Sequence, residues 1–343
     1  MHYRPLGASG AVVSTYALGT MTFGAESDEA TSHAMLDDYV AAGGNLIDTA
    51  DVYSAGTSEE IIGRWLAARP TEREQVLIAS KARIAMAQGV NDVGSSRRHL
   101  GPALDASLRR LGMERIDLYQ MHAWDPITPL EETLRFLDDA VRAGKIAYYG
   151  FSNFLGWQLT KAVCIAQAVG FAPPVTLQPQ YSLLVREIEF EIVPACLDAG
   201  LGMLPWSPLA GGYLTGKYRR GAEPSGDTRL GEDPRRGMEA WDRRGRQERT
   251  WRVIDVVDEI AKARGISMAQ VALAWTEAQP AVTSVILGAR NTDQLADNLA
   301  AASVELTPDE LQRLDDVSAP PANDYPYGEM GIEQRDRSIE PGG

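Results

Sequence analysis

The stretch NLIDTADVYSAGTSEEIIG, Asn45–Gly63, decides the fold. It starts with a short apolar run, typical of a buried strand, that reaches Asp48. Tyr53 follows five positions later, small and polar residues come next, and a helical pattern begins in SEEIIG. The stretch therefore predicts a strand–loop–helix unit that offers a carboxylate and a phenol at one edge. The alternative is ordinary loop chemistry, in which Asp48 caps a turn.

The same alternation of apolar runs and helical patterns continues through most of the chain. Eight runs are predicted as strands, and their near-continuous apolar character is typical of a parallel sheet buried on both faces. The runs are Tyr16–Thr20, Asn45–Thr49, Val76–Lys81, Ile116–His122, Ile146–Ser152, Val175–Gln180, Gly202–Ser207 and Ser284–Gly288. Eight strands alternating with helices predict the α/β class and a (β/α)8 TIM barrel, with an open doubly wound sheet as the alternative.

The helical patterns carry start and stop signals of their own. Ser27 is predicted to cap a helix that ends at Gly43–Gly44. Further helices are predicted over Pro129–Lys145, Ser267–Ala278 and Thr292–Ala302. These helices would cover the outside of the sheet, as the alternation requires.

Three segments fall outside this alternation. YRPLGASGAVVSTYAL, Tyr3–Leu18, has apolar runs on both sides of Gly-Ala-Ser-Gly and predicts a hairpin before the barrel. Residues 210–247, after the seventh strand, are rich in Gly, Pro and charge and predict a long structureless loop acting as a lid or cofactor belt. We expect residues 1–320 to form a single domain and residues 321–343 to be a tail that is either mobile or covers a pocket.

Composition excludes several classes of function. The chain has 343 residues, of which 44% are hydrophobic and 23% charged, and its net charge of −14 disfavours nonspecific nucleic-acid binding. No apolar stretch approaches the ~20 residues of a membrane span, and the N-terminus lacks the apolar centre of a secretory signal. We therefore expect a cytoplasmic protein. Two cysteines, Cys164 and Cys196, and four scattered histidines give no disulfide framework and predict no metal site.

Three of the predicted strands end in a titratable side chain: Asp48, Lys81 and His122. Tyr53 lies just beyond the second strand, in the same layer of loops. Taken singly, an Asp can cap a turn, a Lys at a strand end can be solvated, and a lone His can be structural. In a barrel, however, the C-terminal ends of the strands meet at one rim, so the four side chains together predict an active site there.

This set suits the reduction of a carbonyl group. A hydride that reaches a carbonyl carbon leaves an alkoxide that needs a proton, and Tyr53 would be the acid. Lys81 would lower the pKa of the phenol, Asp48 would hold Lys81, and His122 would orient the carbonyl oxygen. No side chain supplies a hydride, so a cofactor must.

The chain resembles the aldo-keto reductases. The motifs that carry the resemblance, in family order, are GGNLIDTADVYSAGTSEEIIG, IASK, IDLYQMH, GFSNF, QPQYSLL, WSPLAGGYLTGKY and VILGARNTDQLADNL. They run through nearly the whole chain, from Tyr3 to about Pro320. The resemblance implies a (β/α)8 barrel closed at its base by an N-terminal hairpin. It also implies a catalytic tetrad of Asp48, Tyr53, Lys81 and His122.

The resemblance further implies a nicotinamide cofactor. Positions that match the family's cofactor contacts are Gly19, Thr20, Met21, Ser152, Asn153, Gln178, Tyr181, Ser207, Leu209, Gly211, Lys217, Gly288, Arg290, Gln294 and Asn298. Among them, Ser152, Asn153 and Gln178 match the residues that bind the nicotinamide carboxamide, and Tyr181 matches the residue that stacks on the nicotinamide ring. Gly19, Thr20 and Met21 match the first-strand contacts near the nicotinamide ribose. The segment with Ser207, Leu209, Gly211 and Lys217 matches the one along the pyrophosphate. The adenosine end is matched by Gly288, Arg290, Gln294 and Asn298, where Arg290 would pair with a 2′-phosphate. Guanidinium suits a phosphate, so we expect NADPH in preference to NADH.

The substrate is less well defined. We expect an aldehyde or ketone, with a keto-sugar as one option, and a pocket wall of apolar side chains. The residues expected in that wall are Phe23, Met86, Trp124, Tyr325 and Tyr327. The alternative is an NADPH-binding regulatory subunit like the β subunits of potassium channels, which share the fold and the tetrad. We expect the enzyme in preference to this alternative, because the sequence shows no long N-terminal extension.

Overall fold

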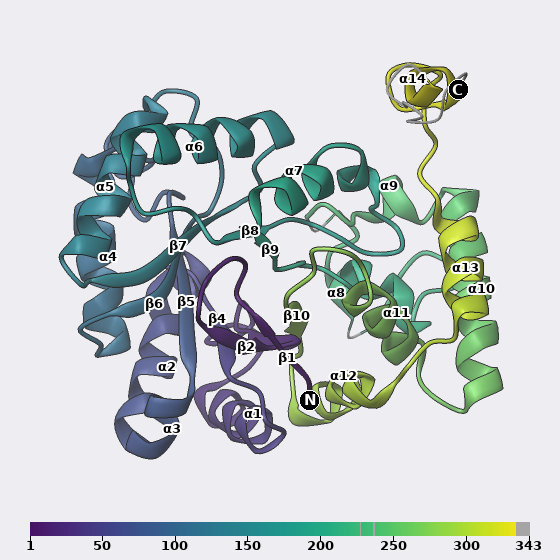
Figure 1. Ribbon diagram of the computed structural model, residues 1–343. Coiled ribbons are helices and arrows are strands. Elements are labelled where there is room, and N and C mark those ends of the chain that lie inside the picture. The colour runs from purple at the N-terminus through teal and green to yellow at the C-terminus, as the bar shows by residue number, and fades with distance from the viewer. Residues whose placement is uncertain (227, 236, 334–343) are drawn as a thin grey trace.

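The computed structural model describes residues 1–226, 228–235 and 237–333, and eight of its strands form one parallel sheet (Figure 1). The strand order is β10-β3-β4-β5-β6-β7-β8-β9, so neighbours in the sheet are mostly neighbours in the chain. The strands are β3 (Tyr16–Gly19), β4 (Leu46–Asp48), β5 (Leu77–Ala82), β6 (Ile116–Met121), β7 (Ile146–Ser152), β8 (Thr176–Gln178), β9 (Gly202–Met203) and β10 (Val285–Gly288). All eight predicted strands are present, several of them shorter than predicted.

Backbone contacts between β9 and the residues just before β10 close the sheet into a barrel. Met203 forms a parallel bridge with Val282. The Met203 N–H donates to Ala281 O at 2.7 Å, and the Thr283 N–H donates to Met203 O at 2.9 Å. The predicted (β/α)8 barrel is therefore confirmed, and the open doubly wound sheet was the wrong alternative.

A two-stranded antiparallel hairpin, β1 (Tyr3–Pro5) and β2 (Val12–Ser14), lies across the end of the barrel that faces the viewer in Figure 1. Leu6 and Val13 of this hairpin are fully buried in a small apolar cluster together with the inward-facing residues of the strands. Arg4 connects the hairpin to the residues before β10 that close the barrel. Its guanidinium donates to Val282 O at 2.6 Å and also binds Glu277. The base of the barrel is thus closed, which leaves the opposite rim for a site.

Strand alternation decides which side chains reach that open rim. Leu46 and Ala79 belong to the apolar cluster inside the barrel. Side chains in a strand alternate between faces, so Asp48 and Lys81, each two residues later, also point inward but lie higher. Ser80, which lies between Ala79 and Lys81 in β5, points outward to the helical layer.

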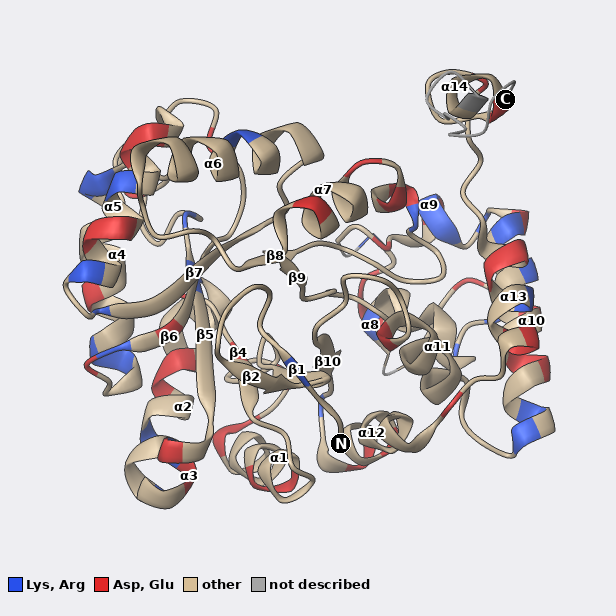
Figure 2. Cartoon of the chain, in the orientation of Figure 1, with Lys and Arg blue, Asp and Glu red and all other residues tan. Residues whose placement is uncertain are grey.

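Helices follow each strand and cover the outside of the sheet (Figure 1). The larger apolar core lies between these helices and the strands. The principal helices are α1 (Glu29–Ala41), α2 (Thr57–Ala68), α3 (Pro70–Gln75), α4 (Arg97–Leu111), α5 (Leu130–Arg142), α6 (Gly156–Val169), α7 (Ile192–Ala199), α10 (Glu248–Arg264), α11 (Met268–Glu277), α12 (Thr292–Ala300) and α13 (Pro308–Ser318). Figure 2 shows that much of the charge lies on the outer helices, among them α4, α5, α10 and α13. No helix within the described ranges is long and apolar enough to cross a bilayer.

The first helix begins one residue later than predicted. Asp28, not Ser27, is the N-cap of α1, and its side chain accepts from the Thr31 N–H at 2.8 Å. Ser27 is buried, and its hydroxyl donates to Arg290 O at 2.9 Å. Both residue types are good caps, so sequence alone did not separate them.

The long segment after β9 is more ordered than predicted. It contains η3 (Ala210–Thr215), α8 (Arg229–Glu232) and α9 (Trp241–Arg244), so the prediction of a structureless loop was wrong at these three places. Tyr213 of this segment is fully buried, and its ring stacks on that of Trp241 with 6.0 Å between the ring centres. Its predicted role as a lid or cofactor belt stays a prediction.

The tail runs past α13 and ends, within the described residues, in α14 (Glu329–Glu333), which Figure 1 shows away from the barrel. Tyr327 stacks on Phe190 at 4.9 Å and donates to Glu191 at 2.7 Å. These contacts lie in the connection between β8 and α7. Residues 334–343 of the predicted tail lie outside the described residues.

Candidate active site

Lys81 is the centre of a hydrogen-bonded group at the open rim of the barrel. Its ammonium donates to Asp48 Oδ2 at 2.6 Å, to Thr49 O at 2.9 Å and to the Tyr53 hydroxyl at 3.2 Å. Gln178 Nε2, from β8, donates to the other Asp48 oxygen at 2.9 Å. Lys81 is fully buried and Asp48 nearly so. All three ammonium hydrogens therefore have acceptors, which a buried charge requires.

Tyr53 is placed by a strained turn beyond the end of β4. The two residues that follow it, Ser54 and Ala55, have φ of +48° and +53°, a left-handed conformation that costs non-glycine residues about 1 kcal/mol or more. The Ser54 hydroxyl holds the turn by donating to Phe23 O at 2.7 Å. The turn returns the phenol to Lys81, whose Nζ lies 4.9 Å from the centre of the Tyr53 ring.

Six of the seven described non-glycine residues with positive φ lie just after the C-terminal ends of strands. They are Ser54, Ala55, Arg83, Asn153, Ser207 and Ala210, and the exception is Ala281. Strain of this kind persists only where the surrounding structure enforces it, and it gathers at functional sites. Its distribution marks the same rim as the tetrad does.

His122 follows β6 and completes the group. Its ring meets the Tyr53 ring edge-on, with 5.9 Å between the ring centres. Burial, followed by the charges of Lys81 and Arg83, lowers the pKa of His122 to about 3. The imidazole is therefore neutral at neutral pH and can donate one hydrogen bond without adding a charge.

The protonation states of the other two groups suit a proton donor. Burial raises the pKa of Tyr53, and the Lys81 charge opposes this rise without cancelling it. Burial, the largest single influence, would lower the pKa of Lys81, but Asp48 and Tyr53 together outweigh it and the net pKa is raised. Lys81 thus acts on Tyr53 in the predicted direction, while the phenol remains protonated at neutral pH.

Three of the residues expected at the nicotinamide carboxamide form a connected group beside the tetrad. The Ser152 hydroxyl donates to Gln178 O at 2.9 Å, and Asn153 Nδ2 donates to Ser152 Oγ at 3.0 Å and to His122 O at 2.9 Å. Tyr181, expected to stack on the nicotinamide, is only 1% exposed. The structure therefore brings Ser152, Asn153 and Gln178 together, and it leaves almost none of the Tyr181 side chain exposed.

The expected contacts after β3 differ in exposure. Thr20 is fully buried, and its hydroxyl donates to Asp48 O at 3.0 Å. Met21 is 42% exposed. Gly19 has no room for a side chain, since a Cβ there would lie 2.7 Å from Ile286. Of the three, Met21 presents the largest free surface.

The residues expected along the pyrophosphate all follow β9: Ser207, Leu209, Gly211 and Lys217. Lys217 folds over Gly212, where an added Cβ would lie 3.2 Å from the lysine side chain. Partial burial, followed by the charge of Arg290, lowers the pKa of Lys217. Two cations held close enough to affect each other make a place where an anionic phosphate group fits.

The residues expected at the adenosine end surround the turn between β10 and α12: Gly288, Arg290, Gln294 and Asn298. The Arg290 N–H donates to Gln294 Oε1 at 3.0 Å, and Asn298 Nδ2 donates to Gly288 O at 3.1 Å. The Arg290 guanidinium pairs with Glu232 at 2.7 Å and lies 4.0 Å from Glu26. Glu232, which the sequence did not single out, brings the segment after β9 onto this end of the site.

The five residues expected in the substrate wall are not gathered in one place. Met86 and Trp124 lie in the loops after β5 and β6, at the rim that carries the tetrad. Phe23 is fully buried in the main core. Tyr325 is 66% exposed in the tail, and Tyr327 packs on the connection before α7. Of the five, Met86 and Trp124 lie at that rim with part of their side chains exposed, and their role in a substrate wall stays a prediction.

A second buried cluster lies behind the site and was missed by sequence reasoning. Glu59 of α2 is fully buried, accepting from the Ser80 hydroxyl at 2.5 Å and from Arg110 Nε at 2.7 Å. Asp51 is also fully buried, and neither its carboxyl oxygens nor the Tyr119 hydroxyl has a hydrogen-bond partner within the described ranges. The local signal in the sequence was the position of Asp51 between Ala50 and Val52, whereas Arg110, the partner of Glu59, is 51 positions away from it.

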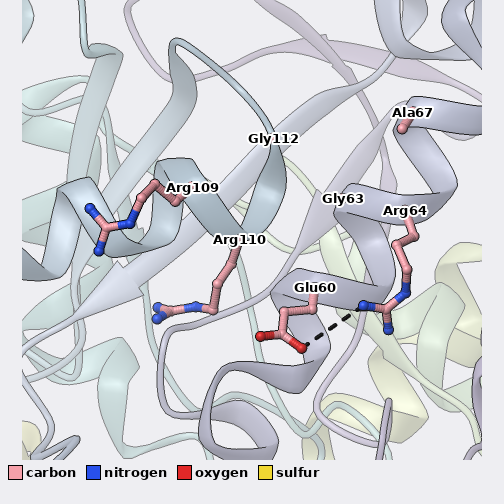
Figure 3. Close-up of a pocket in the computed structure, with 7 residues that line it drawn as sticks. All are labelled: Glu60, Gly63, Arg64, Ala67, Arg109, Arg110 and Gly112. Carbon is pink, nitrogen blue, oxygen red and sulfur yellow. Dashed lines mark ion pairs between the residues drawn. The ribbon is translucent and has the colours of Figure 1, made fainter.

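A hollow of about 330 Å³ lies on the outer helical layer, between α2 and the end of α4 (Figure 3). It is lined by Glu60, Gly63, Arg64, Ala67, Arg109, Arg110 and Gly112. Arg64 and Glu60 pair across its edge at 3.9 Å. The hollow lies between helices and not at the rim of the barrel, so it is separate from the candidate active site.

Comparison with known proteins agrees with this geometry. Residues 16–319 match the aldo/keto reductase family. The chain is 37% identical to the "Uncharacterized oxidoreductase YrpG" of Bacillus subtilis (strain 168), over 95% of this chain and 98% of that protein. It is 36% identical to a "Probable voltage-gated potassium channel subunit beta" of Oryza sativa subsp. japonica (92% and 96%) and 35% identical to the "Versiconal hemiacetal acetate reductase" of Aspergillus parasiticus (94% and 98%). By its barrel and by these matches, the chain belongs to the aldo/keto reductase family.

Proposed function

We propose that this chain reduces an aldehyde or ketone to the alcohol with NADPH as hydride donor. The observation that carries the proposal is the buried Lys81 ammonium, which contacts the Asp48 carboxylate and the Tyr53 hydroxyl within 3.2 Å. Burial keeps the proton on the phenol at neutral pH, and the Lys81 charge stabilises the phenolate left after transfer. Similarity to a protein named as a reductase supports the reaction class.

Each member of the tetrad then has one task. NADPH, when bound, supplies the hydride to the carbonyl carbon. Tyr53 gives its proton to the carbonyl oxygen, while the Lys81 charge favours the phenolate that remains. Asp48 keeps Lys81 charged and in place. Neutral His122 donates a hydrogen bond that orients the carbonyl oxygen beside the phenol.

The preference for NADPH rests on the two cations Lys217 and Arg290. A 2′-phosphate would meet the Arg290 guanidinium and would compete there with the Glu232 carboxylate. Arg290→Ala should therefore weaken binding of NADPH much more than binding of NADH, as measured by titrating the protein fluorescence. An equal loss for the two cofactors would contradict the role given to Arg290.

The function is tested by following the loss of NADPH absorbance with 4-nitrobenzaldehyde. Tyr53→Phe should lower kcat by roughly 10²- to 10⁴-fold, the usual share of general acid catalysis, with NADPH binding largely retained. Tyr3→Phe, a change to a half-exposed hairpin tyrosine outside the site, is the matched control. A Tyr53→Phe protein that turns over at the full rate would refute the mechanism.

The similarity to a protein named as a potassium channel β subunit supports a second proposal, an NADPH-binding regulatory subunit. The two proposals differ in turnover. A protein that binds NADPH tightly but oxidises it with none of a broad panel of aldehydes, ketones and keto-sugars would favour the regulatory role. Steady turnover with any of them would favour the enzyme.

A further inference from the structure

Arg83 occupies a strained position at the rim of the candidate active site. It follows β5 directly, two residues after Lys81, and has a φ of +124°. A residue with a side chain rarely adopts this backbone conformation, so the surrounding structure must enforce it. The Gly94 N–H, which donates to Arg83 O at 2.9 Å, is one contact that does so. Glycine would fit this position without strain, yet the chain carries arginine.

The Arg83 guanidinium has N–H donors that no described protein group accepts. Nη2 donates to Trp124 O at 3.0 Å, whereas the buried Nε has no hydrogen-bond partner in the part of the chain that the structure describes. A guanidinium has five N–H donors in a fork that matches the oxygens of a carboxylate or phosphate. Most of that capacity is unused here.

Most of the other partly or fully buried arginines among the described residues are paired with carboxylates. Examples are Arg110 with Glu59 at 2.7 Å, Arg186 with Glu189 at 2.7 Å and Arg244 with Glu239 at 2.9 Å. Arg83 makes no such ion pair with any described residue, although the chain carries 47 acidic residues and a net charge of −14. Arg249 of α10 makes none either, but it donates to Ser318 O and feels the charge of Glu187. A partly buried arginine without an ion pair is therefore uncommon in the described part of this protein.

The acidic residue of the adjoining loop, Asp125, already accepts hydrogen bonds from other groups. Asp125 follows Trp124, whose carbonyl Arg83 contacts. Its carboxylate accepts from the Ser95 N–H at 2.7 Å, the Thr128 hydroxyl at 2.6 Å and the Ile127 N–H at 3.0 Å. These bonds hold the loop after β6 and leave the Arg83 charge without a counterion from it.

Arg83 also lies next to the residue that would hold the carbonyl. The His122 N–H donates to Ala82 O at 2.9 Å, so the chain reaches Arg83 directly beside His122. The charge of Arg83 acts on the imidazole strongly enough to contribute to its lowered pKa. A group bound by the guanidinium would therefore belong to the same small molecule whose carbonyl faces His122 and Tyr53.

We propose that Arg83 binds an anionic group of the carbonyl substrate, so that this chain prefers aldehydes or ketones bearing a carboxylate or a phosphate. The proposal rests on the proposed reductase function and adds the substrate class to it. The strain at Arg83 is then retained because the guanidinium is needed at this point of the rim.

The test compares matched pairs of substrates that differ in charge. 4-Carboxybenzaldehyde is paired with methyl 4-formylbenzoate, and glyceraldehyde 3-phosphate is paired with glyceraldehyde. The quantity measured is the ratio of kcat/KM for the anionic member to kcat/KM for its neutral partner. The first pair reports on a carboxylate and the second on a phosphate. The wild-type ratio should exceed one in at least one pair and should fall as salt is added.

Arg83→Gly is the most informative variant, because glycine removes the guanidinium and also relieves the strained φ. Its melting temperature should equal or exceed that of the wild type, while the anionic-to-neutral ratio falls roughly 10- to 100-fold, mostly through KM. Arg83→Lys keeps the charge without the planar fork and should give an intermediate ratio. Arg98→Gln, at an exposed arginine of α4, removes the same charge away from the rim and should leave the ratio as in the wild type.

Two outcomes would overturn the proposal. One is a wild-type protein that reduces neutral 4-nitrobenzaldehyde but shows no preference for the anionic member of either pair; this leaves the reductase function standing. The other is an Arg83→Gly protein that loses anionic and neutral substrates equally.

A binding measurement covers the case in which no carbonyl is turned over. Tryptophan fluorescence is titrated with 4-(hydroxymethyl)benzoate and, separately, with inorganic phosphate. The wild type should bind one of them at least about tenfold more tightly than Arg83→Gly does. Equal binding by the two proteins would reject the anion site even if the reductase function had also failed.

Discussion

Two buried charge clusters lie back to back on either side of β5. Lys81 points into the barrel and pairs with Asp48, while its neighbour Ser80 points outward to Glu59. We call the first the front cluster (Asp48, Tyr53, Lys81, Gln178) and the second the rear cluster (Asp51, Glu59, Ser80, Arg110, Tyr119). The front cluster pairs one carboxylate with one cation, and the rear cluster has two carboxylates and one cation. Most of these side chains are buried, whereas Tyr53 and Arg110 are partly exposed.

The clusters differ in how completely their polar groups are satisfied. In the front cluster both Asp48 oxygens and all three Lys81 hydrogens are used. In the rear cluster one cation faces two carboxylates, and the carboxyl oxygens of Asp51 have no hydrogen-bond partner among the residues described. Burial, and then the charge of Glu59, raises the pKa of Asp51 to about 7.

This difference separates two functions of buried charge. Under the proposed function, the front cluster fixes the protonation of a phenol and presents that phenol to a substrate. The rear cluster lies away from the rim, and its Arg110 reaches the hollow between α2 and α4, so we expect its effect to fall on stability and on how stability depends on pH. A buried ionic group near a catalytic site therefore need not take part in the chemistry.

The largest effect should come from removing the front cation. Lys81→Met leaves the Asp48 carboxylate buried without a counter-charge, which typically costs about 3–5 kcal/mol of unfolding free energy. It should also lower carbonyl reduction by roughly 10²- to 10⁴-fold, because the phenolate loses its stabilising charge. Urea unfolding and the NADPH assay measure the two losses. The double variant Lys81→Met with Asp48→Asn should recover part of the stability and none of the rate; recovery of the rate would contradict the role given to Lys81.

The matched change in the rear cluster should affect stability alone. Arg110→Met leaves Glu59 and Asp51 facing each other without a cation, and we expect a loss of about 2–4 kcal/mol. The arginine side chain is 20% exposed, which makes the loss smaller than for Lys81. The kcat of the folded fraction should stay within about threefold of the wild type, since general acid catalysis does not pass through this cluster. A rate loss as large as that of Lys81→Met would show that the two clusters act as one.

The smallest effect concerns pH. The folded pKa of Asp51 is about 7, above the unfolded value of about 3.9, so the folded state binds the extra proton. Stability from this group is complete below about pH 4 and is lost as pH rises through 7, on the order of 2–3 kcal/mol between pH 5 and 8. Asp51→Asn should remove that loss, giving a flatter curve of unfolding free energy against pH. A variant that keeps the wild-type slope would assign the slope to another group.

Much of the fold could be predicted because its signals are local. Apolar runs and helix caps recur along the chain, and the resulting (β/α)8 barrel is the one observed. The rim position of Asp48, Lys81 and His122 followed from strand ends alone, since parallel strands deliver their C-terminal ends to one edge. Their roles in catalysis stay proposals that the experiments above address.

The rest could not be predicted because it depends on pairing over long distances. Nothing near Glu59 in sequence shows that Arg110 neutralises it, and nothing near Arg290 points to Glu232, 58 positions away. Arg83 gave no signal either, because its strained φ and unused donors exist only in three dimensions. Residue type predicted which side chains could do chemistry, and the structure was needed to find which of them lack partners.

The short strand β9 affects where the barrel opens locally. No paired ladder joins β9 to β10 among the described strands; the joint rests on the bonds of Met203, on the Ile286 N–H that donates to Pro205 O at 3.0 Å and on Arg4 of the hairpin. Local opening favours places where few bonds must break, so we expect this seam to be one of the places where the barrel opens. The segments that follow β9 and β10 are those proposed to hold the cofactor phosphates. Under that proposal the bound dinucleotide contacts the segments on both sides of the seam. The cofactor that supplies the hydride should therefore also stabilise the closed barrel.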